Sequence, residues 1–419
     1  MNKPAAPPPE QEGVVLLGTD TPIGLAVVRD LGHHGYRVVG IGRRAEALAG
    51  ASRYCHHHAV RADGETGLIA QIVALARDHG ARFLLAVGES DLLLLNRHRE
   101  TLEKALELLV PSEDQLLQVI DKAACQEHAK AVGLAVPRSW QFASLEEARQ
   151  AAGDLSYPAV LKWADPHRVS RALEKEGLPL VKTGYAHDSD DLVRQLTPYA
   201  AIGSFPMVQE YCRGHGLGQM FLVRDGSVLM EFQHERLHEW PPEGGASTLC
   251  RGVPLQKHGE LRDLSRALLQ RLRWTGVAMV EYRHDPASGR SAFMEINGRF
   301  WGSLPLAIAA GLPFAAGLVA HCAREERPLP LPRDYPVLTA CYWIPETKRL
   351  LRVLFQRQRI QDPFYRPDPL RSLLSYLSIP LHPSSRWFVF QLTDPGPFLA
   401  DLASVLRKLR LRRQGQRRG

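Results

Sequence analysis

The sequence contains few cysteines, six among 419 residues, and no two of them form a CxxC pair. They are scattered along the chain at Cys55, Cys125, Cys212, Cys250, Cys322 and Cys341. A disulfide framework needs dense, paired cysteines in a short chain, so this class of protein is excluded. Scattered reduced thiols are typical of the cytoplasm, and we expect a cytoplasmic protein.

The chain also has little that would reach or cross a membrane. Its N-terminus, MNKPAAPPPEQEG, lacks the apolar stretch of about 7 to 15 residues found in a secretory signal, and residues 1–12 are interpreted as a disordered leader. The stretch 303–322 has no Asp, Glu, Lys or Arg over about 20 residues, the length of a bilayer span. Because it contains Pro305, Gly311 and Pro313, buried helix packing is favoured over a span.

Basic charge is concentrated instead of being spread over the chain. The net charge is +7, but the last 19 residues hold seven Arg and Lys and one Asp, which leaves +1 for the other 400 residues. A basic field over the whole molecule is therefore excluded, and we expect no nucleic-acid partner. The tail is interpreted as a solvated helix end, with contact to an anionic membrane or an acidic partner as the alternative. A homodimer is neither predicted nor excluded.

A dinucleotide fingerprint is missing as well. Residues 13–42 follow the order strand, helix, strand, and a second helix–strand unit follows, which predicts a Rossmann-like domain with parallel strands over 13–115. The first loop has glycines at Gly18 and Gly24, six positions apart, and does not match GxGxxG. This spacing disfavours an oxidoreductase that binds a nicotinamide cofactor.

Two polar clusters in this domain have structural explanations. Cys55-His-His-His58 lies on an expected strand, where neighbouring side chains point to opposite faces, so we do not expect a metal site there. Glu89 and Asp91 follow a strand at the edge where open α/β sheets bind ligands. Capping of the next helix is nevertheless the favoured explanation for both acids.

Beyond residue 115 the pattern changes to short strands and hairpin turns, which predicts an α+β region. The strand-like runs are 159–163, 180–182, 207–211, 219–224, 227–233, 277–283 and 291–297. We expect a domain over 116–325, with a smaller lid subdomain at about 137–212. A helical C-terminal segment, 326–419, would follow and carry the basic tail.

The most informative feature is a pair of acids in GVAMVEYRHDPASGRSAFMEINGRFWG. A hairpin centred on Ser288 places Glu281 opposite Glu295, with Asn297 two residues further along the same face. Facing carboxylates repel each other unless a cation lies between them, and Mg²⁺ prefers such oxygen ligands. A solvated hairpin in another register is the alternative.

Fixed cations accompany this pair in the sequence. Lys162 ends the apolar run YPAVLKW, where an unpaired ammonium group is costly, and Lys122 opens a helical segment. Together with Arg299, just beyond Asn297, they suit a polyphosphate bound with magnesium. Taken alone, each lysine would be interpreted as a surface residue whose stem covers apolar groups.

The order of these residues resembles the ATP-grasp superfamily over about residues 13–325. The ordered match consists of Lys122, Lys162, Gln209-Glu210-Tyr211, Glu281 and Glu295-Ile-Asn297-Gly-Arg299. The stretches HERLHEWPPEGGASTL and MEINGRFWGSLPLAIAAG resemble its carboxylate-amine ligase-like group of ATP-dependent carboligases. The resemblance implies an α/β and α+β protein: a Rossmann-like pre-ATP-grasp domain, an ATP-grasp fold of two α+β subdomains, and a helical C-terminal segment.

The resemblance also implies a cofactor set and residue roles. The residues expected at the nucleotide are Lys122 and Lys162 at the ATP phosphates, and Gln209, Glu210 and the backbone of Tyr211 and Cys212 at the adenine. Mg²⁺, or Mn²⁺, would be held by Glu281, Glu295 and Asn297, and Arg299 would steady the phosphoryl or acyl-phosphate group. Such enzymes phosphorylate a carboxylate with ATP and let an amine or similar nucleophile displace the phosphate, which releases ADP.

The sequence also offers candidates for a residue that binds the acid substrate and for a lid that closes over the site. Arg236 shares one face of an extended stretch with His234 and His238 and could bind a substrate carboxylate in bidentate fashion, or it could be a surface charge. An acyl phosphate must be kept from water, so we expect a lid, either between residues 162 and 182 or at 240–245.

Two departures from the family pattern accompany the match. No glycine occurs in 165–175, where many relatives have a glycine-rich phosphate loop, and no acid occurs in 213–218, where one would hold the ribose. The favoured hypothesis is a Mg²⁺-dependent, ADP-forming ligase that acts on a small carboxylate and an amine. An ATP-binding sensor or scaffold with little or no turnover is the alternative. The sequence does not identify the acid or the amine.

Overall fold

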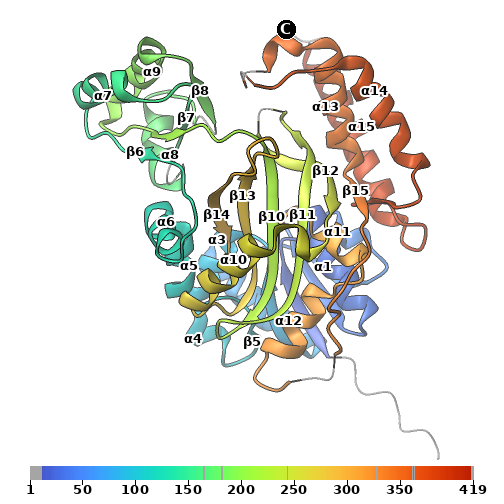
Figure 1. Cartoon of the computed structure of the whole chain (residues 1–419). Coiled ribbons are helices and arrows are strands. Elements are labelled where there is room, and N and C mark those ends of the chain that lie inside the picture. Colours follow the sequence, from blue (N-terminus) through green and yellow to red (C-terminus); the bar gives the residue numbers. More distant parts are fainter. Residues whose placement is uncertain are drawn as a thin grey trace, which may run out of the picture.

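The computed structural model describes residues 12–163, 166–180, 183–242, 244–326, 329–360, 362 and 364–416. The expected leader lies outside the described residues except for its last residue. The described strands form sheets of five, seven and four strands. Figure 1 shows the four-stranded sheet standing apart at upper left, with the C-terminal helices gathered at upper right.

The first sheet is parallel and has the order β3-β2-β1-β4-β5. Its strands are β1 (Gly13–Leu17), β2 (Arg37–Gly42), β3 (Cys55–Val60), β4 (Ala81–Ala86) and β5 (Glu107–Leu108), and its helices are α1 (Pro22–His33), α2 (Glu65–His79), α3 (Glu89–Arg97) and α4 (Arg99–Leu102). β1 is buried along its whole length because α1 and α2 pack on opposite faces: Val14 and Leu16 lie in one apolar cluster, Val15 and Leu17 in another.

Thr21 explains where α1 begins. Its side chain accepts a hydrogen bond from the Gly24 N–H, and Pro22 occupies the first turn. The expected capping of α3 by Glu89 or Asp91 is wrong. The N-cap of α3 is Gly88, which makes no side-chain cap, and Asp91 instead forms an ion pair with Arg61.

The four-stranded sheet belongs to a lid subdomain with its own apolar core. Its antiparallel strands, in the order β6-β9-β7-β8, are β6 (Ser139–Trp140), β9 (Met207–Glu210), β7 (Ala159–Lys162) and β8 (Gly184–Ala186), and its helices are α7 (Leu145–Ala151), α8 (Pro166–Lys175) and α9 (Ser189–Leu196). The strand expected at 180–182 is placed differently. Leu180 is exposed and outside any strand, residues 181–182 lie outside the described ranges, and β8 begins at Gly184, where it pairs with Leu161.

The seven-stranded sheet has the order β14-β13-β10-β11-β12-β15-β16. Its strands are β14 (Ser291–Asn297), β13 (Gly276–His284), β10 (His215–Arg224), β11 (Ser227–Trp240), β12 (Ala246–Gly252), β15 (Thr339–Cys341) and β16 (Ser385–Trp387). The sequence pattern did not predict β12, β15 or β16. The strand-like run for β10 began four residues late, because glycines at 216 and 218 interrupt its apolar pattern. The run for β11 ended seven residues early, at 233, where polar side chains begin, although 234–238 was expected to be extended.

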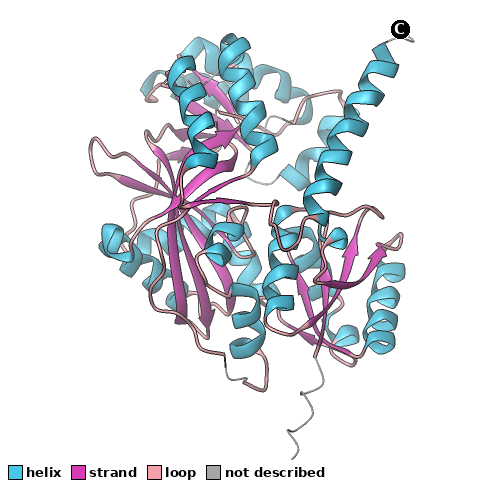
Figure 2. Ribbon diagram, turned by 90° about the vertical axis from the view of Figure 1, so that its right-hand side faces the viewer, coloured by secondary structure: helices cyan, strands magenta, loops and turns pink. Residues whose placement is uncertain are grey.

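Helices cover both faces of this sheet. The helices α5 (Glu113–Ile120), α6 (Lys122–Ala131) and α10 (Gly259–Arg271) pack on one face, and α11 (Leu304–Ala309) and α12 (Phe314–Cys322) fill the space toward the parallel sheet. Figure 2 shows the two larger sheets side by side with helices between them. The stretch 303–322 is therefore buried in protein as expected. Among the described residues, no helix combines the length and apolarity of a membrane span.

The C-terminal segment is mainly helical, with α13 (Trp343–Phe355), α14 (Pro369–Ser378) and α15 (Gly396–Gln416). It is not purely helical, because β15 and β16 extend the large sheet next to β12. A buried ion pair between Asp394 and Arg29 of α1, 2.9 Å apart, fixes the segment to the first domain.

Candidate active site

The hairpin of β13 and β14 carries the acid pair in the expected register. Glu281 lies directly opposite Glu295, and Asn297 pairs with Met279 two positions further along. The amide nitrogen of Asn297 lies 3.2 Å from Glu295 Oε1 and 3.5 Å from Glu281 Oε2. Between Glu281 and Tyr282 the register shifts by one residue at a bulge, so the uniform pairing expected for the hairpin is wrong near the turn but right at the acids.

Arg236 supplies the counter-charge to this pair. One of its terminal guanidinium nitrogens donates to Glu281 Oε2 at 2.7 Å, and the other lies 3.5 Å from Glu239 Oε1. Burial raises the pKa of Glu281, with Arg236 opposing the shift and the Glu295 charge adding to it. The Arg236 side chain is 15% exposed, so the alternative of a surface charge is wrong.

The donor set fits a hard cation. It consists of two carboxylates and one amide oxygen on one hairpin face, without a thiol or imidazole. No cluster of three or more His, Cys, Asp or Glu side chains with metal-binding geometry exists in the described part of the chain, so a nitrogen- or sulfur-rich zinc site finds no support there. Magnesium, which commonly takes one or two protein carboxylates together with phosphate oxygens, suits this set.

The two lysines lie in the electrostatic neighbourhood of the acids. Lys162 is the last residue of β7, and Lys122 is the first residue of α6, which Asp121 caps. Burial and the nearby Lys122 charge lower the pKa of Lys162 to about 8, while Glu295 and Glu281 oppose the shift. Among the described residues neither ammonium group has a hydrogen-bond or ion-pair partner, so two neighbouring cations lack an anion.

The residues expected at the adenine lie where the lid joins the large sheet. Gln209 is buried and donates to Ser139 Oγ, while the Glu210 carboxylate accepts from the Arg138 N–H at 3.2 Å and lies 3.9 Å from Arg290. Tyr211 and Cys212 follow β9 in the connection to β10. Burial raises the pKa of the Cys212 thiol, which makes it a poor nucleophile near neutral pH.

Arg299 lies beyond the triad with its backbone in a loop. Its guanidinium group donates to the Phe300 carbonyl at 3.0 Å and is half-buried. In the described residues it has no carboxylate partner and no direct contact with Glu281, Glu295 or Asn297.

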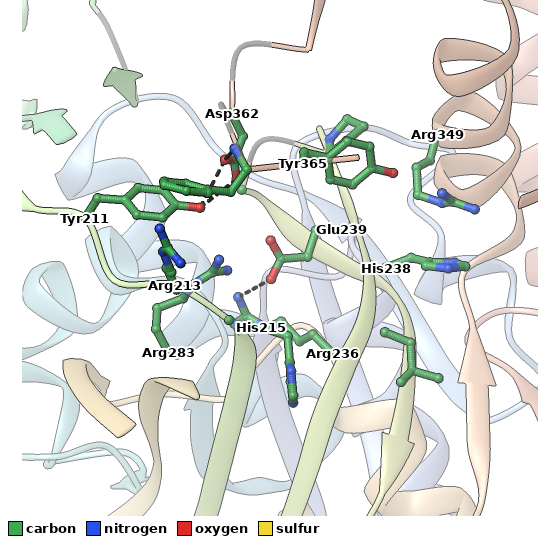
Figure 3. Close-up of a pocket in the computed structure, with 15 residues that line it drawn as sticks. Tyr211, Arg213, His215, Arg236, His238, Glu239, Arg283, Arg349, Asp362 and Tyr365 are labelled. Atoms are coloured by element: carbon green, nitrogen blue, oxygen red, sulfur yellow. Dashed lines mark hydrogen bonds and ion pairs between the residues drawn. The ribbon is translucent and has the colours of Figure 1, made fainter. Parts of the chain in front are cut away.

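A cavity of about 340 Å³ adjoins the triad on the far side of Arg236. Figure 3 shows Glu239 pointing into its centre, with Arg213 and Arg283 together beneath the Tyr211 ring. In the described part of the chain, neither Arg213 nor Arg283 has a hydrogen-bond or ion-pair partner. The cavity lining therefore contains four arginines, Arg213, Arg236, Arg283 and Arg349, and two carboxylates, Glu239 and Asp362.

One sequence feature, a run of alternating glycines, indicates the region of this cavity. Gly214, Gly216 and Gly218 alternate around β10 and keep side chains off one face, and a Cβ at Gly216 would lie 2.6 Å from Arg236 Cδ and 3.1 Å from Glu239 Oε1. Sequence reasoning used this stretch only to note a missing acid. The glycine alternation could have indicated a place where side chains of a neighbouring strand approach the backbone closely.

The C-terminal segment contributes a wall that no sequence signal indicated. Asp362 accepts a hydrogen bond from the Tyr211 hydroxyl at 3.0 Å, and Phe364 packs against the Tyr211 ring with centroids 5.0 Å apart. The guanidinium of Arg213 lies 4.2 Å from the centroid of the Phe364 ring. The C-terminal segment thus forms one wall of the cavity, next to Tyr211 and Arg213.

One of the two expected lid segments, 240–245, borders the cavity. In place of a glycine-rich loop, α8 follows β7, and residues 164–165 and 181–182 lie outside the described ranges. Pro242 and Gly244 of the β11–β12 hairpin line the cavity, and Glu243 between them lies outside the described ranges. Gly244 has φ of 125°, a conformation that other residues rarely adopt.

The chain was compared with protein-family models and with curated proteins. No protein-family model matches the chain. Over 243 residues it is 27% identical to the carbamoyl phosphate synthase large chain of Thermus thermophilus, a match that covers 55% of this chain and 23% of that protein. The chain thus spans about a quarter of the length of the curated relatives that it matches.

Solved structures match over more of their length. The N5-carboxyaminoimidazole synthetase of Staphylococcus aureus has a TM-score of 0.60 at 13% identity, covering 85% of this chain and 90% of that one. The biotin carboxylase of Campylobacter jejuni, in complex with β,γ-ATP, has a TM-score of 0.58 at 15% identity, covering 76% and 72%. These neighbours share the overall fold of this chain, which agrees with the ATP-grasp fold that the sequence resemblance implied.

Proposed function

We propose that the protein is a Mg²⁺-dependent, ADP-forming ligase that activates a small carboxylate as an acyl phosphate and joins it to an amine or similar nucleophile. The observation that carries the proposal is the facing of Glu281 and Glu295, bridged by Asn297, in the field of Lys162. This arrangement offers oxygen ligands for a hard cation beside fixed cations for a polyphosphate.

The metal and the nucleotide have candidate ligands in this chain. Glu281, Glu295 and Asn297 would hold magnesium, which neutralises phosphate charge when bound. Lys162 and Lys122 bind phosphate oxygens, because both ammonium groups lack an anion among the described residues. Phosphoryl transfer needs positioning and charge neutralisation more than covalent help, and these five side chains supply both.

The nucleoside is proposed to bind where the lid meets the large sheet, at Gln209, Glu210 and the backbone of Tyr211 and Cys212. Glu239 is proposed as the acid that holds the ribose. Its carboxylate occupies the space above Gly216 that a side chain of β10 would otherwise fill, and its side chain is 13% exposed with Arg236 as its only partner among the described residues.

Two arginines are proposed to act on the acid substrate. Arg236 links the Glu281 carboxylate to the cavity and can orient a substrate carboxylate there without leaving its place. Arg299, half-buried beyond Asn297, is proposed to steady the acyl phosphate. The partners are a small acid and an amine, as the names of the relatives suggest for ATP-driven carboxylate chemistry in general. Location in the cytoplasm stays a prediction, and a homodimer is neither predicted nor excluded.

Titration calorimetry with Mg·ATP, followed by ADP release with panels of acids and pooled amines, tests the proposal. We expect Glu295→Ala to reduce ADP release by about 100-fold or more while the protein remains folded, because transition-state charge loses its stabilisation. Glu260→Gln, at an exposed position on α10, is the matched control and should change little.

Two results would contradict the ligase. Absence of Mg·ATP binding would remove the whole proposal. Binding without ADP release, unchanged by Glu295→Gln, would instead identify the sensor or scaffold.

A further inference from the structure

The C-terminal helices expose an unusual amount of apolar surface. On α14, Leu370, Leu373, Leu374 and Leu377 follow one helical stripe and are all exposed, Leu370 by 67%. No residue of α14 is buried. We call these leucines, together with Leu381, Leu392, Leu399, Leu402 and Leu406, the C-terminal face.

The second half of this face belongs to α15 and the loop before it. Leu399, Leu402 and Leu406 lie three and four positions apart, which places them on one side of α15. Leu377 of α14 and Phe398 of α15 line the same apolar cavity of about 450 Å³, so the two helices border one surface. Apolar side chains that gather at the surface are typical of sites that bind a partner or a membrane.

The segment that carries these leucines is rich in positive charge. Residues 343–416 contain thirteen Lys and Arg against five Asp and Glu, a net charge of +8, whereas the whole chain carries +7. The rest of the chain is therefore nearly neutral. The exposed cations of this segment include Lys348, Arg357, Arg359, Arg366, Arg371, Arg386 and Arg407. Of its acids, Glu346 is buried in an ion pair with Arg349 of the same segment, and Asp394 is buried in an ion pair with Arg29 of α1, so neither carboxylate lies at the surface.

We propose that the C-terminal face binds the surface of an anionic lipid bilayer, with the leucines of α14 and α15 in the interfacial layer and the cations of the same segment at the headgroups. Exposed leucine stripes beside Lys and Arg are the combination by which helices lie on anionic membranes. The cations and the leucines each add affinity, so both are needed for stable attachment.

The charge argues against a second copy of the chain as the occupant. A two-fold interface brings the same patch of both subunits together, so two segments of +8 would face each other. Like-charge juxtaposition opposes such pairing, whereas an anionic surface relieves it. The proposal is independent of the ligase activity, because none of these residues lies in the candidate active site.

Co-sedimentation of the full-length protein with vesicles tests the proposal. We expect binding to mixed phosphatidylcholine–phosphatidylglycerol vesicles, no binding to pure phosphatidylcholine vesicles, and weaker binding as salt is added. Leu374→Glu with Leu399→Glu should reduce binding by about tenfold or more, and Arg371→Glu with Arg386→Glu should do the same. Val60→Glu, at an exposed apolar position on β3 outside the C-terminal face, is the control and should bind as the wild type does.

The exposed positions of these substitutions should leave folding intact, which circular dichroism and unchanged Mg·ATP binding would verify. Failure of the wild type to bind anionic vesicles overturns the proposal, as does binding that neither double variant reduces. A dimer in sedimentation velocity that Leu374→Glu dissociates would assign the face to a second copy and overturn it equally.

Discussion

At the scale of single residues, the site combines groups that are costly to fold and useful for binding. Lys162 is a desolvated cation with a second lysine nearby, and Glu281 is a desolvated acid opposite another acid. Structure alone offers little reason to keep such groups. Their cost is explained if a bound phosphate and cation restore the missing charges.

Replacement of Lys162 by methionine should therefore stabilise the protein without nucleotide. The pKa of Lys162 in the folded protein, about 8, lies below that of an unfolded lysine. The buried ammonium group therefore lowers the free energy of unfolding fully at pH 7, and this loss disappears as the pH rises from about 8 to about 10.5. We expect Lys162→Met to raise the free energy of unfolding at pH 7 by about 1 to 3 kcal/mol and to remove the rise with pH.

Urea unfolding at pH 7 and pH 10 measures both effects, and the variant should lose Mg·ATP affinity in calorimetry. Lys130→Met, in a surface ion pair with Glu127, is the control and should change stability by less than about 0.5 kcal/mol. A less stable Lys162→Met protein would show that Lys162 serves packing instead.

At the scale of elements, the neighbouring strands β10 and β11 together shape the region beside the cavity. β10 lacks side chains at Gly216 and Gly218, and β11 places Arg236 and Glu239 over Gly216. In our proposal, Glu239 of the next strand takes the role of the ribose-binding acid that is missing from 213–218. This substitution is invisible in a linear motif, because only the strand pairing brings Glu239 above Gly216.

Glu239→Gln should weaken ATP binding more than 2′-deoxy-ATP binding, since a carboxylate accepts a ribose hydroxyl proton more strongly than an amide does. We expect a loss of about tenfold for ATP and of less than about threefold for the deoxy analogue, measured by calorimetry. Equal losses for both nucleotides would contradict the ribose role. A higher KM for the amine at unchanged ATP affinity would place the amine at Glu239.

At the scale of the whole molecule, the C-terminal segment is part of the site and not an appendage. It adds β15 and β16 to the large sheet and brings Asp362 onto Tyr211. Its attachment to the first domain rests on Asp394, which accepts from Arg29, the Ser52 hydroxyl and the Arg53 N–H.

Asp394→Ala should leave the Arg29 guanidinium buried without its carboxylate, at a cost of about 3 to 5 kcal/mol in the free energy of unfolding. Chemical denaturation measures this loss. Asp263→Ala, which removes an exposed carboxylate from α10, is the control and should cost less than about 0.5 kcal/mol. A loss near that of the control would mean that the segment is held elsewhere.

The sequence by itself determined what depends on residue order and local pattern. It predicted the parallel unit from alternating apolar runs, and the facing of Glu281 and Glu295 from the hairpin between them. The ordered lysines and acids indicated the ATP-grasp fold that the solved structures share. These features are readable because each follows from the period of a strand or the register of a short turn.

Only the tertiary structure decided the features built from distant segments. The pairing of Arg236 with Glu281, the place of Glu239 above Gly216, and the wall formed by Asp362 and Phe364 join residues far apart along the chain. β15 and β16 are three residues each and gain their stability from the sheet edge that they extend. Short-range preferences do not encode such contacts, because their free energy comes from the burial and pairing that the completed fold provides.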